Sequence, residues 1–383
     1  MNEAPSAPLR AQACVDLDAI AANVAALDQR AGDAGVMAVV KADGYGHGLV
    51  PSARASLAGG ASWLGVAFIE EALALRAAGV TAPILSWLAA PGEPLTDALA
   101  ADIDVSVSEV WSLEEVRRAA AATDRVARVH LKADTGLHRG GATPQRWPDL
   151  VEAAAKVEAG GEIRVVGVWS HLAYADAPGH PTVERQEQVF AEALELAARA
   201  GLHPDVRHLA NSAATLTRPS SHFDLVRPGI AVYGLTPVPQ DGPSSTYGLR
   251  PAMTVTARVA LTKRADAGAG VSYGHRYTTE RETTLALVPL GYADGVPRNA
   301  TNIAEVFTGG HRRRIAGTVC MDQFVVDVGD DPVVEGDEVV LFGAGDDGAP
   351  TAQEWADALG TISYEIVTRI GPRVPRTYVG GGG

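Results

Sequence analysis

A lysine follows directly on a run of apolar residues. Lys41 ends the run VMAVVK (36–41), and a glycine-rich turn that carries Tyr45 comes next. A lysine at the end of a buried strand is partly desolvated, which lowers its pKa from about 10.4 toward neutrality. Such an amine can act as a nucleophile or a base, or it can form an imine. The alternative is a lysine that extends from the strand end into solvent.

Polar side chains also follow four later apolar runs, and their types suit one cofactor. Ser212, at a turn from strand to helix, and the backbone N–H groups of Gly229 and Ile230 would bind a phosphate between the last two strands of a barrel. Together with a lysine and an arginine that faces the ring, these groups are what pyridoxal phosphate requires. A structural ion pair is the alternative interpretation of Arg227. The four runs end in Lys132 to Gly140, Ser170-His171, His208 to Ser212 and Arg227 to Ile230.

The elements that carry these residues are eight short apolar runs, which alternate with longer Ala-, Leu- and charge-rich stretches up to about residue 240. The runs are almost continuously hydrophobic, as strands are in a parallel sheet covered on both faces. Eight strand–helix units in this length predict an α/β fold, a (β/α)8 TIM-type barrel. An open, doubly wound sheet is the alternative, although no GxGxxG motif follows the first run. The runs are VMAVVK (36–41), WLGVAF (63–68), ILSWL (84–88), IDVSV (103–107), VARVHLK (126–132), VVGVWSHL (165–172), VRHLAN (206–211) and LVRPGIAVYG (225–234).

The pattern changes after a segment rich in proline, glycine and serine at 236–248. Beyond it, alternating runs split by Gly and Asp turns predict a mostly β domain, with little helix before 351–359. We therefore divide the chain into a barrel at 10–240 and a β-domain at 241–379. The runs of the second domain are AMTVTARVALTKRA (252–265), TTLALVPLGYAD (283–294), AEVFTGGHRRRIAG (304–317), QFVVDVGD (323–330) and DEVVLF (337–342).

The charge balance argues against a nucleic-acid partner. Asp and Glu number 46 against 32 Lys and Arg, which gives a net charge of -14, and the basic residues are scattered. No positive footprint for nucleic acid or anionic lipid is therefore expected. The exception is a run of three arginines at 312–314 beside a Gly-Gly turn, which predicts a solvated hairpin, with a nucleic-acid patch as the alternative.

Cysteine usage and the ends of the chain indicate a cytoplasmic protein. Cys14 and Cys320 are the only cysteines, which excludes a disulfide scaffold and a multi-cysteine metal site. The first residues lack a signal-peptide pattern, and no stretch approaches the roughly 18 apolar residues of a membrane span. We expect no metal and no membrane partner, and we expect residues 1–9 and 380–383 to be disordered.

Eight motifs in this order resemble the alanine racemase family, whose members combine an N-terminal barrel with a C-terminal β-domain. The resemblance extends from about Ala13 to Tyr378. It implies a pyridoxal-phosphate-dependent isomerase that interconverts L- and D-alanine and supplies D-alanine for peptidoglycan. The motifs are VVKADGYGHG (39–48), HLKADTGLHRGG (130–141), SHLAYAD (170–176), HLANSAA (208–214), DLVRPGIAVYG (224–234), GVSYGH (270–275), PLGYADGVPR (289–298) and CMDQ (320–323).

Position by position, the resemblance implies that Lys41 binds pyridoxal 5′-phosphate covalently and that Arg227 faces its pyridine nitrogen. A guanidinium keeps its proton, so the ring nitrogen would stay largely unprotonated and the ring would be a weaker electron sink. A weaker sink disfavours side reactions such as transamination. The other implied contacts are Tyr45, Ser212, Gly229, Ile230 and Tyr364 at the phosphate, and His171 and Asn211 along the ring.

Racemisation removes a proton from one face of the α-carbon and returns it to the other, which implies two bases. The resemblance makes these Lys41 and Tyr273, the latter from GVSYGH (270–275) in the β-domain. Tyr273 is expected to act in the site of a partner subunit, so the resemblance implies a homodimer with composite sites. Without the family, Tyr273 would be interpreted as a packing residue at a strand edge. A phenol with a pKa near 10 needs help to act as a base, and His171 with Arg227 behind it is the suggested relay.

The resemblance also assigns the substrate contacts and the entrance. Arg139 and the Met321 backbone would bind the substrate, and Lys132 is a lysine that is often carbamylated in the family. Thr318 departs from the family, because an arginine is frequent at that position, and it bears on the charge and width of the entrance. Smaller departures are Gly44, Leu137, His138 and Gly140, and the residues that match the entrance are Tyr292, Tyr364, Asp176 and Arg298.

Three other functions are open at this stage. A pyridoxal-phosphate carrier with the same barrel would lack a β-domain with a second base. An amino-acid decarboxylase would carry an acidic partner for the pyridine nitrogen and a Cys-Glu-Ser-type loop, which Arg227 and CMDQ (320–323) do not provide. A broad-specificity racemase would differ only in the room around the substrate side chain.

Overall fold

The computed structural model describes residues 9–381, and the chain packs as two compact units. One unit contains Ala19–Leu249, and the other contains the described residues up to Asp18 and from Arg250 onward. Of the ends predicted to be disordered, residues 1–8 and 382–383 lie outside the described part. Within the described part, the N–H of Gly381 donates a 2.9 Å hydrogen bond to the carboxylate of Asp18, so Gly381 has a hydrogen-bond partner.

The first unit is built on an eight-stranded sheet with the order β8-β7-β6-β5-β4-β3-β2-β9, and its pairings are parallel. A parallel bridge between Asn211 and Arg227 joins the chain beyond β8 to the chain beyond β9. The sheet therefore closes, which confirms the predicted (β/α)8 barrel over the open sheet. Its strands are β2 (Gly35–Val39), β3 (Trp63–Val66), β4 (Ile84–Ser86), β5 (Asp104–Val107), β6 (Ala127–Lys132), β7 (Ile163–Trp169), β8 (Val206–His208) and β9 (Leu225–Val226).

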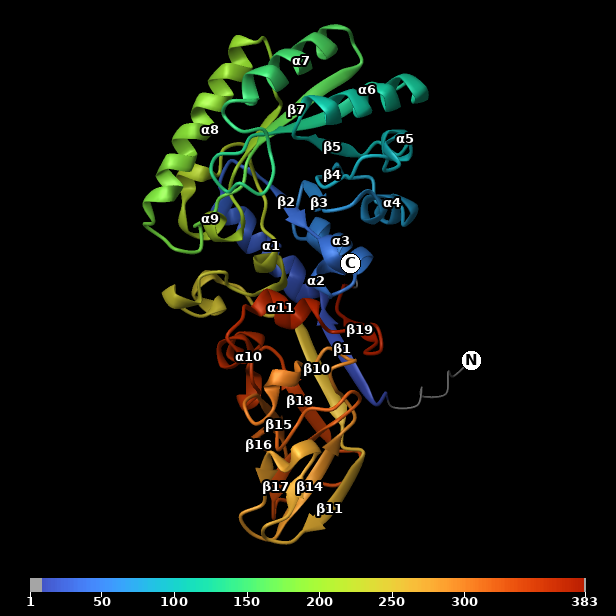
Figure 1. Cartoon of the computed structure of the whole chain (residues 1–383), viewed down its shortest axis with the longest axis vertical. Helices are drawn as coiled ribbons and strands as arrows, with labels where there is room; N and C mark the ends of the chain where they lie inside the picture. The colour runs from blue at the N-terminus through green and yellow to red at the C-terminus, as the bar shows by residue number, and fades with distance from the viewer. Residues whose placement is uncertain (1–8, 382–383) are drawn as a thin grey trace. The chain divides into compact units, whose positions relative to one another are not determined.

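Helices connect these strands and pack along the outside of the sheet (Figure 1). In α1 (Leu17–Ala31), the buried residues Ile20, Val24, Leu27 and Ala31 recur every three or four positions, so they share one face of the helix. The sequence itself shows this helical spacing of apolar residues over 18–32. The other helices of the unit are α2 (Lys41–Tyr45), α3 (Leu49–Ala58), α4 (Ile69–Ala77), α5 (Leu95–Ala100), α6 (Val110–Thr123), α7 (Trp147–Ala159), α8 (Pro181–Arg199) and α9 (Ser212–Thr217).

The interior of the barrel is mostly apolar. Met37, Leu85 and Leu225 are buried side by side, and Trp63 packs against them. Burying one such side chain contributes about 1.5–3 kcal/mol. Two polar side chains of the strands, His130 and His208, are also fully buried. Buried polar groups require hydrogen-bond partners, and those of the two histidines lie at the candidate site.

The second unit is mostly β, as its sequence predicts. It contains a six-stranded sheet of order β16-β15-β18-β10-β1-β19, a three-stranded sheet β11-β14-β17 and the pair β12-β13. The elements are β1 (Ala11–Asp16), β10 (Met253–Arg258), β11 (Leu261–Ala265), β12 (Gly270–Val271), β13 (Tyr277–Thr278), β14 (Thr283–Val288), β15 (Glu305–Thr308), β16 (His311–Arg314), β17 (Phe324–Gly329), β18 (Glu338–Phe342), α10 (Ala352–Leu359), α11 (Ser363–Thr368) and β19 (Arg376–Val379).

The run of three arginines forms the predicted hairpin. β15 and β16 pair antiparallel, with Thr308 opposite His311 across the Gly-Gly turn. Arg312 lies 2.7 Å from Glu354, and Arg313 forms an ion pair with Asp331. Carboxylates of the same unit thus neutralise two of these arginines.

The boundaries of the units differ from those placed on the sequence, which were 10–240 and 241–379. Ala11–Asp16 forms β1, which pairs with β10 and β19 in the β-unit, and the barrel unit extends to Leu249. The six residues alternate between buried and half-buried, the period of a strand packed on one face. Both partner strands, β10 and β19, lie far from β1 in the sequence, and local patterning cannot reveal such a pairing.

None of the described helices is long and apolar enough to cross a membrane. No group of three or more His, Cys, Asp or Glu side chains among residues 9–381 is arranged to hold a metal ion.

Candidate active site

Lys41 begins a turn of left-handed backbone directly after β2. The next four residues have positive φ angles, which are 53° at Ala42, 54° at Asp43, 61° at Gly44 and 52° at Tyr45. The left-handed conformation costs about 1–2 kcal/mol for each residue other than glycine. Strain of this kind persists only where the surroundings enforce it, and it is frequent at functional sites.

Hydrogen bonds within the segment hold this turn, together with hydrogen bonds that backbone N–H groups donate to one neighbouring carboxylate. Glu71 at the start of α4 accepts from the N–H of Ala42 at 2.6 Å, and its second oxygen accepts from Ala67 at 2.9 Å. Asp43 accepts from the N–H of Leu49 at 2.7 Å. Hydrogen bonds therefore hold the backbone of the turn directly after Lys41.

The environment of Lys41 lowers the pKa of its amine. Burial is the main cause, Arg139 lowers the pKa further by charge repulsion, and Glu71 opposes both. The sequence predicted this shift from the position at a buried strand end. A larger neutral fraction favours reaction with a carbonyl group.

Ser212, Gly229 and Tyr45 come together at the ends of β8 and β9. The Ser212 hydroxyl accepts from the N–H of Gly229 at 2.8 Å, at the start of α9. A Cβ atom at Gly229 would lie 2.2 Å from the Tyr45 hydroxyl, so only glycine leaves room for this contact. Burial raises the pKa of Tyr45, which therefore remains a neutral donor. The structure therefore places Ser212, Gly229 and Tyr45 side by side. A pair of hydroxyl groups beside backbone N–H groups fits a phosphate.

Asn211 has a structural role in the barrel. Its Oδ1 accepts from the N–H of Ala214 at 3.1 Å and caps α9, and its backbone bridges to Arg227. It thus fixes the loop that carries Ser212. Ile230 is buried and begins the 3-10 helix Ile230–Tyr233 directly after Gly229.

Arg227 lies buried beneath this cluster. Its guanidinium donates to the carbonyl of Ser170 at 2.7 Å and lies 4.9 Å above the ring of Trp169. Burial lowers the pKa of Arg227 to about 9, so the group remains charged at neutral pH. No ion pair with a carboxylate accompanies it among the described residues, so the alternative of a structural ion pair is wrong.

Two histidines accept hydrogen bonds from Arg227. Nη1 lies 3.1 Å from Nδ1 of His208, and Nη2 lies 3.3 Å from Nδ1 of His171. Because a guanidinium only donates, both Nδ1 atoms accept and each imidazole carries its proton on Nε2. Burial and the charge of Arg227 hold the pKa of both histidines well below the usual range, so both are neutral.

The hydrogen bonds continue through the barrel interior from His208. Its Nε2 lies 2.8 Å from Nδ1 of His130, whose Nε2 lies 3.3 Å from Asp104, and Arg128 binds the same carboxylate at 2.7 Å. Burial would raise the pKa of Asp104, but hydrogen bonds from His130 and Arg128 outweigh it and hold the pKa below its ordinary value. An unbroken chain thus connects Asp104 to Arg227.

Sequence reasoning did not assign His130, His208, Asp104 or Trp169. The two histidines stand in motifs that the resemblance quotes, HLKADTGLHRGG (130–141) and HLANSAA (208–214). The available signal was an ionisable residue inside an apolar run, which is costly unless paired. Which residues pair across the barrel depends on strand register, which the sequence does not show.

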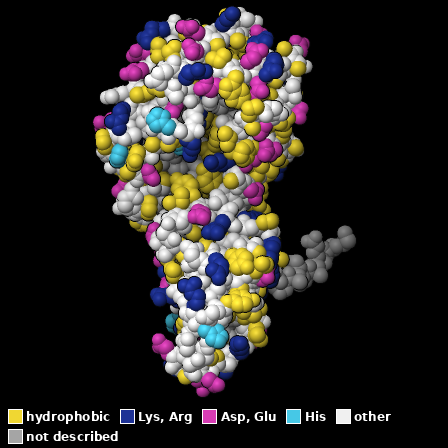
Figure 2. All heavy atoms as spheres, in the orientation of Figure 1, with side chains coloured by type: hydrophobic (Ala, Val, Ile, Leu, Met, Phe, Trp, Pro, Cys, Tyr) yellow, Lys and Arg dark blue, Asp and Glu magenta, His cyan; other side chains and the backbone are white. Residues whose placement is uncertain are grey.

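Lys132, Arg139 and Asp176 differ in exposure. The Lys132 amine lies 4.4 Å from the ring centre of Trp169, and burial, with Arg227 and Arg139 nearby, lowers the pKa of Lys132 to about 8. Arg139 is exposed but close enough to lower the pKa of Lys41, Lys132 and His171. Asp176 is exposed, and its carbonyl accepts from Gln240. Figure 2 shows one face of the molecule, on which the barrel unit is hollowed and Lys and Arg side chains lie at the hollow.

The β-unit carries the remaining predicted residues. Tyr273 begins the 3-10 helix Tyr273–His275 and is 76% exposed. Met321 is 52% exposed, and its carbonyl accepts from the N–H of Ala293 at 2.9 Å. The neighbouring N–H of Tyr292 donates to Cys320 at 3.0 Å, so the loops of Tyr292 and Met321 lie side by side. Arg298 is exposed, and Tyr364 in α11 is half-buried.

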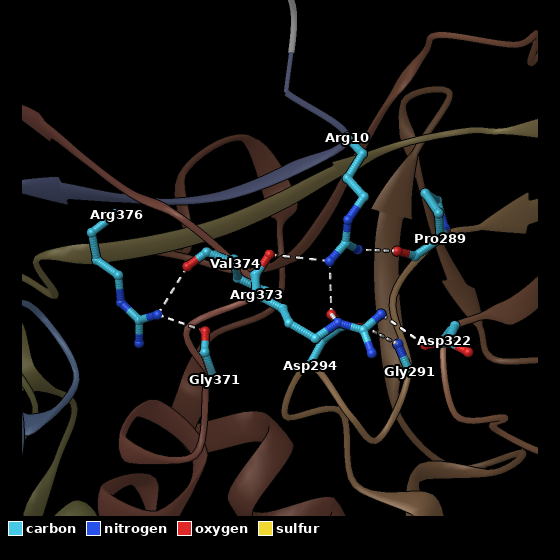
Figure 3. Close-up of polar contacts among 9 residues, drawn as sticks. All are labelled: Arg10, Pro289, Gly291, Asp294, Asp322, Gly371, Arg373, Val374 and Arg376. Carbon is cyan, nitrogen blue, oxygen red and sulfur yellow. Dashed lines mark hydrogen bonds and ion pairs between the residues drawn. The ribbon is translucent and has the colours of Figure 1, made fainter.

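The buried Asp294 connects the loops of Tyr292 and Met321 through Arg373 (Figure 3). Asp294 is 1% exposed, and it binds Arg10 at 2.8 Å and Arg373 at 3.2 Å. It also accepts from the N–H of Gly291 at 2.9 Å. Arg373 reaches Asp322, beside Met321, at 2.7 Å. Arg373 thus links Asp294 of the 289–298 loop to Asp322 of the 320–323 loop, and Arg10 binds the first loop at Asp294 and at the carbonyl of Pro289.

Comparisons with known proteins cover nearly the whole chain. Residues 15–237 match the family described as "Alanine racemase, N-terminal domain", and residues 252–378 match "Alanine racemase, C-terminal domain". Alanine racemase of Frankia casuarinae is 68% identical over 97% of both chains, and that of Thermobifida fusca is 63% identical over 97% and 98%. The crystal structure of alanine racemase from D-cycloserine-producing Streptomyces lavendulae is similar at 56% identity, a TM-score of 0.97 and 98% coverage of each chain.

Proposed function

The chain belongs to the alanine racemase family and interconverts L-alanine and D-alanine, and we propose that it does so with pyridoxal 5′-phosphate held in the barrel. The observation that carries this proposal is the convergence of Lys41, the Ser212–Gly229–Tyr45 cluster and the guanidinium of Arg227. The Gly229 position, where a Cβ atom would fill the space beside Tyr45, supports a fit for the phosphate. Bound pyridoxal phosphate withdraws electrons from an attached amino acid and so acidifies its α-C–H bond.

In this proposal, two side chains exchange the α-proton with opposite faces of the substrate. Lys41 attaches the cofactor and takes the α-proton of D-alanine on one face, and Tyr273 takes that of L-alanine on the other. Each base returns a proton when the reaction runs in reverse. The lowered pKa of Lys41 supports this role, because it increases the fraction of the amine that is neutral and can accept a proton.

Arg227 and His171 would complete the electrostatics of the site. Arg227 remains charged and only donates, so it would hold the pyridine nitrogen of the cofactor by a donated hydrogen bond and disfavour protonation of that nitrogen. His171 is neutral and carries its proton on Nε2, which in the proposed relay would donate to the phenolate oxygen of Tyr273. Asn211 along the ring, and Ile230 and Tyr364 at the phosphate, are the remaining proposed cofactor contacts.

We propose that the enzyme is a homodimer in which each barrel receives Tyr273 and Met321 of the partner subunit. The exposure of both side chains supports this, as does a cavity of about 560 Å³ lined by Tyr273, Lys263 and Phe324 on the β-unit. Mixed dimers of Lys41→Ala and Tyr273→Phe subunits test this arrangement. One hybrid site then holds both intact bases and recovers activity, whereas inactive verified heterodimers would place both bases in the same chain.

Arg139 and the Met321 backbone would be the substrate-carboxylate and oxyanion contacts, and a carbamylated Lys132 would orient Arg139. A pKa of about 8 leaves a sizeable neutral fraction of Lys132. The neutral amine can attack carbon dioxide, which forms an N–C bond and releases one proton to water, and the carbamate is an anion suited to Arg139. A carbamate signal in a ¹³CO₂-labelled sample that Lys132→Ala abolishes tests this modification.

Tyr292, Tyr364, Asp176 and Arg298 are proposed to line the substrate entrance. We further propose that the enzyme works in the cytoplasm and that its D-alanine enters cell-wall peptidoglycan. Both proposals rest on membership of the family.

Incubation of the purified holoenzyme with L-alanine, L-serine and L-lysine tests the function. We expect D-alanine to form fastest, with no release of carbon dioxide. Comparable rates for all three substrates would indicate a broad-specificity racemase. Release of carbon dioxide would indicate a decarboxylase, and binding of cofactor without turnover would indicate a carrier.

A further inference from the structure

The turn that carries Tyr273 has a strained backbone and little packing of its own. Ser272 has a φ of 62° and His275 a φ of 43°, and Gly274 between them has a φ of 70°. Positive φ is uncommon for residues other than glycine. Because Tyr273 is 76% exposed, packing of its side chain cannot hold this conformation. Contacts of the backbone with other segments must do so.

One of these contacts is a reciprocal pair of hydrogen bonds with Thr318. The Thr318 hydroxyl donates to the carbonyl of Tyr273 at 2.7 Å, and the Ser272 hydroxyl donates to the carbonyl of Thr318 at 2.7 Å. Thr318 is only 3% exposed, so water does not readily replace its hydroxyl. The two segments touch closely, because a Cβ atom at Gly317 would lie 2.6 Å from the carbonyl oxygen of Val271.

The same segment also fixes the far end of the turn, through Asn302. The Asn302 amide donates to the carbonyl of Arg276 at 2.7 Å, and its oxygen accepts from the N–H of Gly317 at 2.6 Å. Thr301 accepts from the N–H of Val319 at 3.0 Å. Residues 317–319 therefore hold the Tyr273 turn at its beginning and at its end.

We propose that Thr318 is a positioning residue for the second base, which rests on the proposed role of Tyr273. The hydroxyl binds the carbonyl of Tyr273 itself, so its loss frees the residue that must aim a phenol at the α-carbon. Proton transfer needs a heavy-atom approach of about 2.6–3.2 Å, and small displacements reduce it steeply. An arginine is frequent at position 318 in the family. This hydrogen bond to the carbonyl of Tyr273 therefore belongs to chains that carry a hydroxyl at that position.

The test compares Thr318→Val, which keeps the shape and removes the hydroxyl, with Thr318→Ser, which restores it. For Thr318→Val we expect kcat from L to D to fall about tenfold with KM little changed, since one hydrogen bond and the placement of the base are lost. Exchange of the α-hydrogen of L-alanine with solvent deuterium should fall by the same factor, while that of D-alanine, which uses Lys41, should persist. Thr318→Ser should recover most of the rate.

A matched control is Thr308→Val in β15. The Thr308 hydroxyl is equally buried and donates to the carbonyl of Glu338 at 2.9 Å, in the same unit but away from Tyr273. The Thr308→Val variant should change thermal stability and leave the ratio of L- to D-alanine exchange at the wild-type value. An unchanged ratio in Thr318→Val, or an equal loss for both enantiomers, overturns the positioning role. If Tyr273→Phe also leaves L-alanine exchange intact, the proposed function of Tyr273 fails instead.

Discussion

The two proposed bases stand on strained turns that are held in different ways. Lys41 precedes four residues of left-handed backbone in the barrel, and Tyr273 lies between Ser272 and His275, which also have positive φ. The barrel turn is closed by its own N–H groups and by Glu71 at the adjoining helix. The β-unit turn depends on side chains of residues 301–302 and 318, which are distant in sequence.

This difference teaches that the barrel turn is a local feature and the Tyr273 turn is a tertiary one. The motif VVKADGYGHG (39–48) contains almost everything that its turn needs, apart from the Glu71 carboxylate. The motif GVSYGH (270–275) does not, because its conformation requires a partner segment some 45 residues later, at Thr318. Variants at each turn can therefore test whether the barrel turn is local and the Tyr273 turn is tertiary.

The largest effect is expected for Lys41→Ala. The variant loses the covalent attachment of the cofactor together with one of the two bases, so racemisation should fall by about 10³-fold or more. Borohydride treatment and denaturation should retain cofactor on the wild type and none on the variant, measured by absorbance and mass spectrometry. Lys156→Ala, at an exposed lysine of α7, is the control and should behave as wild type. An active Lys41→Ala enzyme would show that Lys41 is neither the attachment point of the cofactor nor one of the two bases.

Tyr273→Phe should affect one direction more than the other. Cofactor binding should survive, because Lys41 remains intact. Exchange of the α-hydrogen of L-alanine should fall by about 10²–10⁴-fold, the usual cost of losing a general base, while exchange of D-alanine persists. Proton NMR in deuterium oxide measures both rates. Equal losses for the two enantiomers, at normal cofactor content, would mean that Tyr273 orders the site and does not exchange a proton.

The strands of the barrel could be predicted because each is a compact run of apolar residues. All eight predicted runs overlap a strand of the closed sheet, from β2 to β9, although β2 and β7 begin before the runs that predicted them. The residues at their ends, such as Lys41 and Ser212, were found for the same reason, since the barrel brings the ends of its strands together. The lowered pKa of Lys41 follows from that placement, as does the hydrogen bond between Ser212 and Gly229.

What the sequence could not reveal are contacts that depend on register or on distant segments. β1 looks like the start of the first domain, yet it pairs with β10 and β19. His130 and His208 meet because β6, β7 and β8 align in a particular register. Thr318 appeared only as a departure from the family, and its hydrogen bond to Tyr273 gives the position a physical meaning. The assignments of Tyr273 and Met321 to a partner's site remain predictions from the family.

Glu71→Ala tests whether the barrel turn is held as described. The variant removes the acceptor for the N–H groups of Ala42, Ala67 and Phe68, which would cost about 1–3 kcal/mol of unfolding free energy. Because Ala42 follows Lys41, we also expect kcat to fall by about tenfold in both directions. Urea unfolding and the two exchange rates measure these effects. Glu70→Ala, at the exposed neighbouring residue, should change neither. A Glu71→Ala enzyme with wild-type rates would mean that the turn holds itself.

The smallest effect on catalysis is expected for Asp104→Asn, at the far end of the chain of hydrogen bonds from Arg227. Arg227 keeps its contacts with Ser170 and Trp169, so the racemisation rates should change less than in Glu71→Ala. Stability should fall by about 1–3 kcal/mol at pH 7, because Arg128 and His130 lose a buried anionic acceptor. Asp102→Asn is the control, since its pair with Arg125 is exposed and contributes about 0–1 kcal/mol.

The stability lost in Asp104→Asn should depend on pH in one direction. Since the pKa of Asp104 is lower in the folded protein than its ordinary value of 3.8, the folded state favours the ionised carboxyl. The contribution of Asp104 is therefore fully present above pH 3.8 and is lost as the pH falls through the lowered pKa. Urea unfolding of both proteins from pH 7 downward should give a constant difference that shrinks only at the acid end. A difference that grew toward acid pH would contradict an ionised Asp104 and would leave His130 without the acceptor that the chain to Arg227 requires.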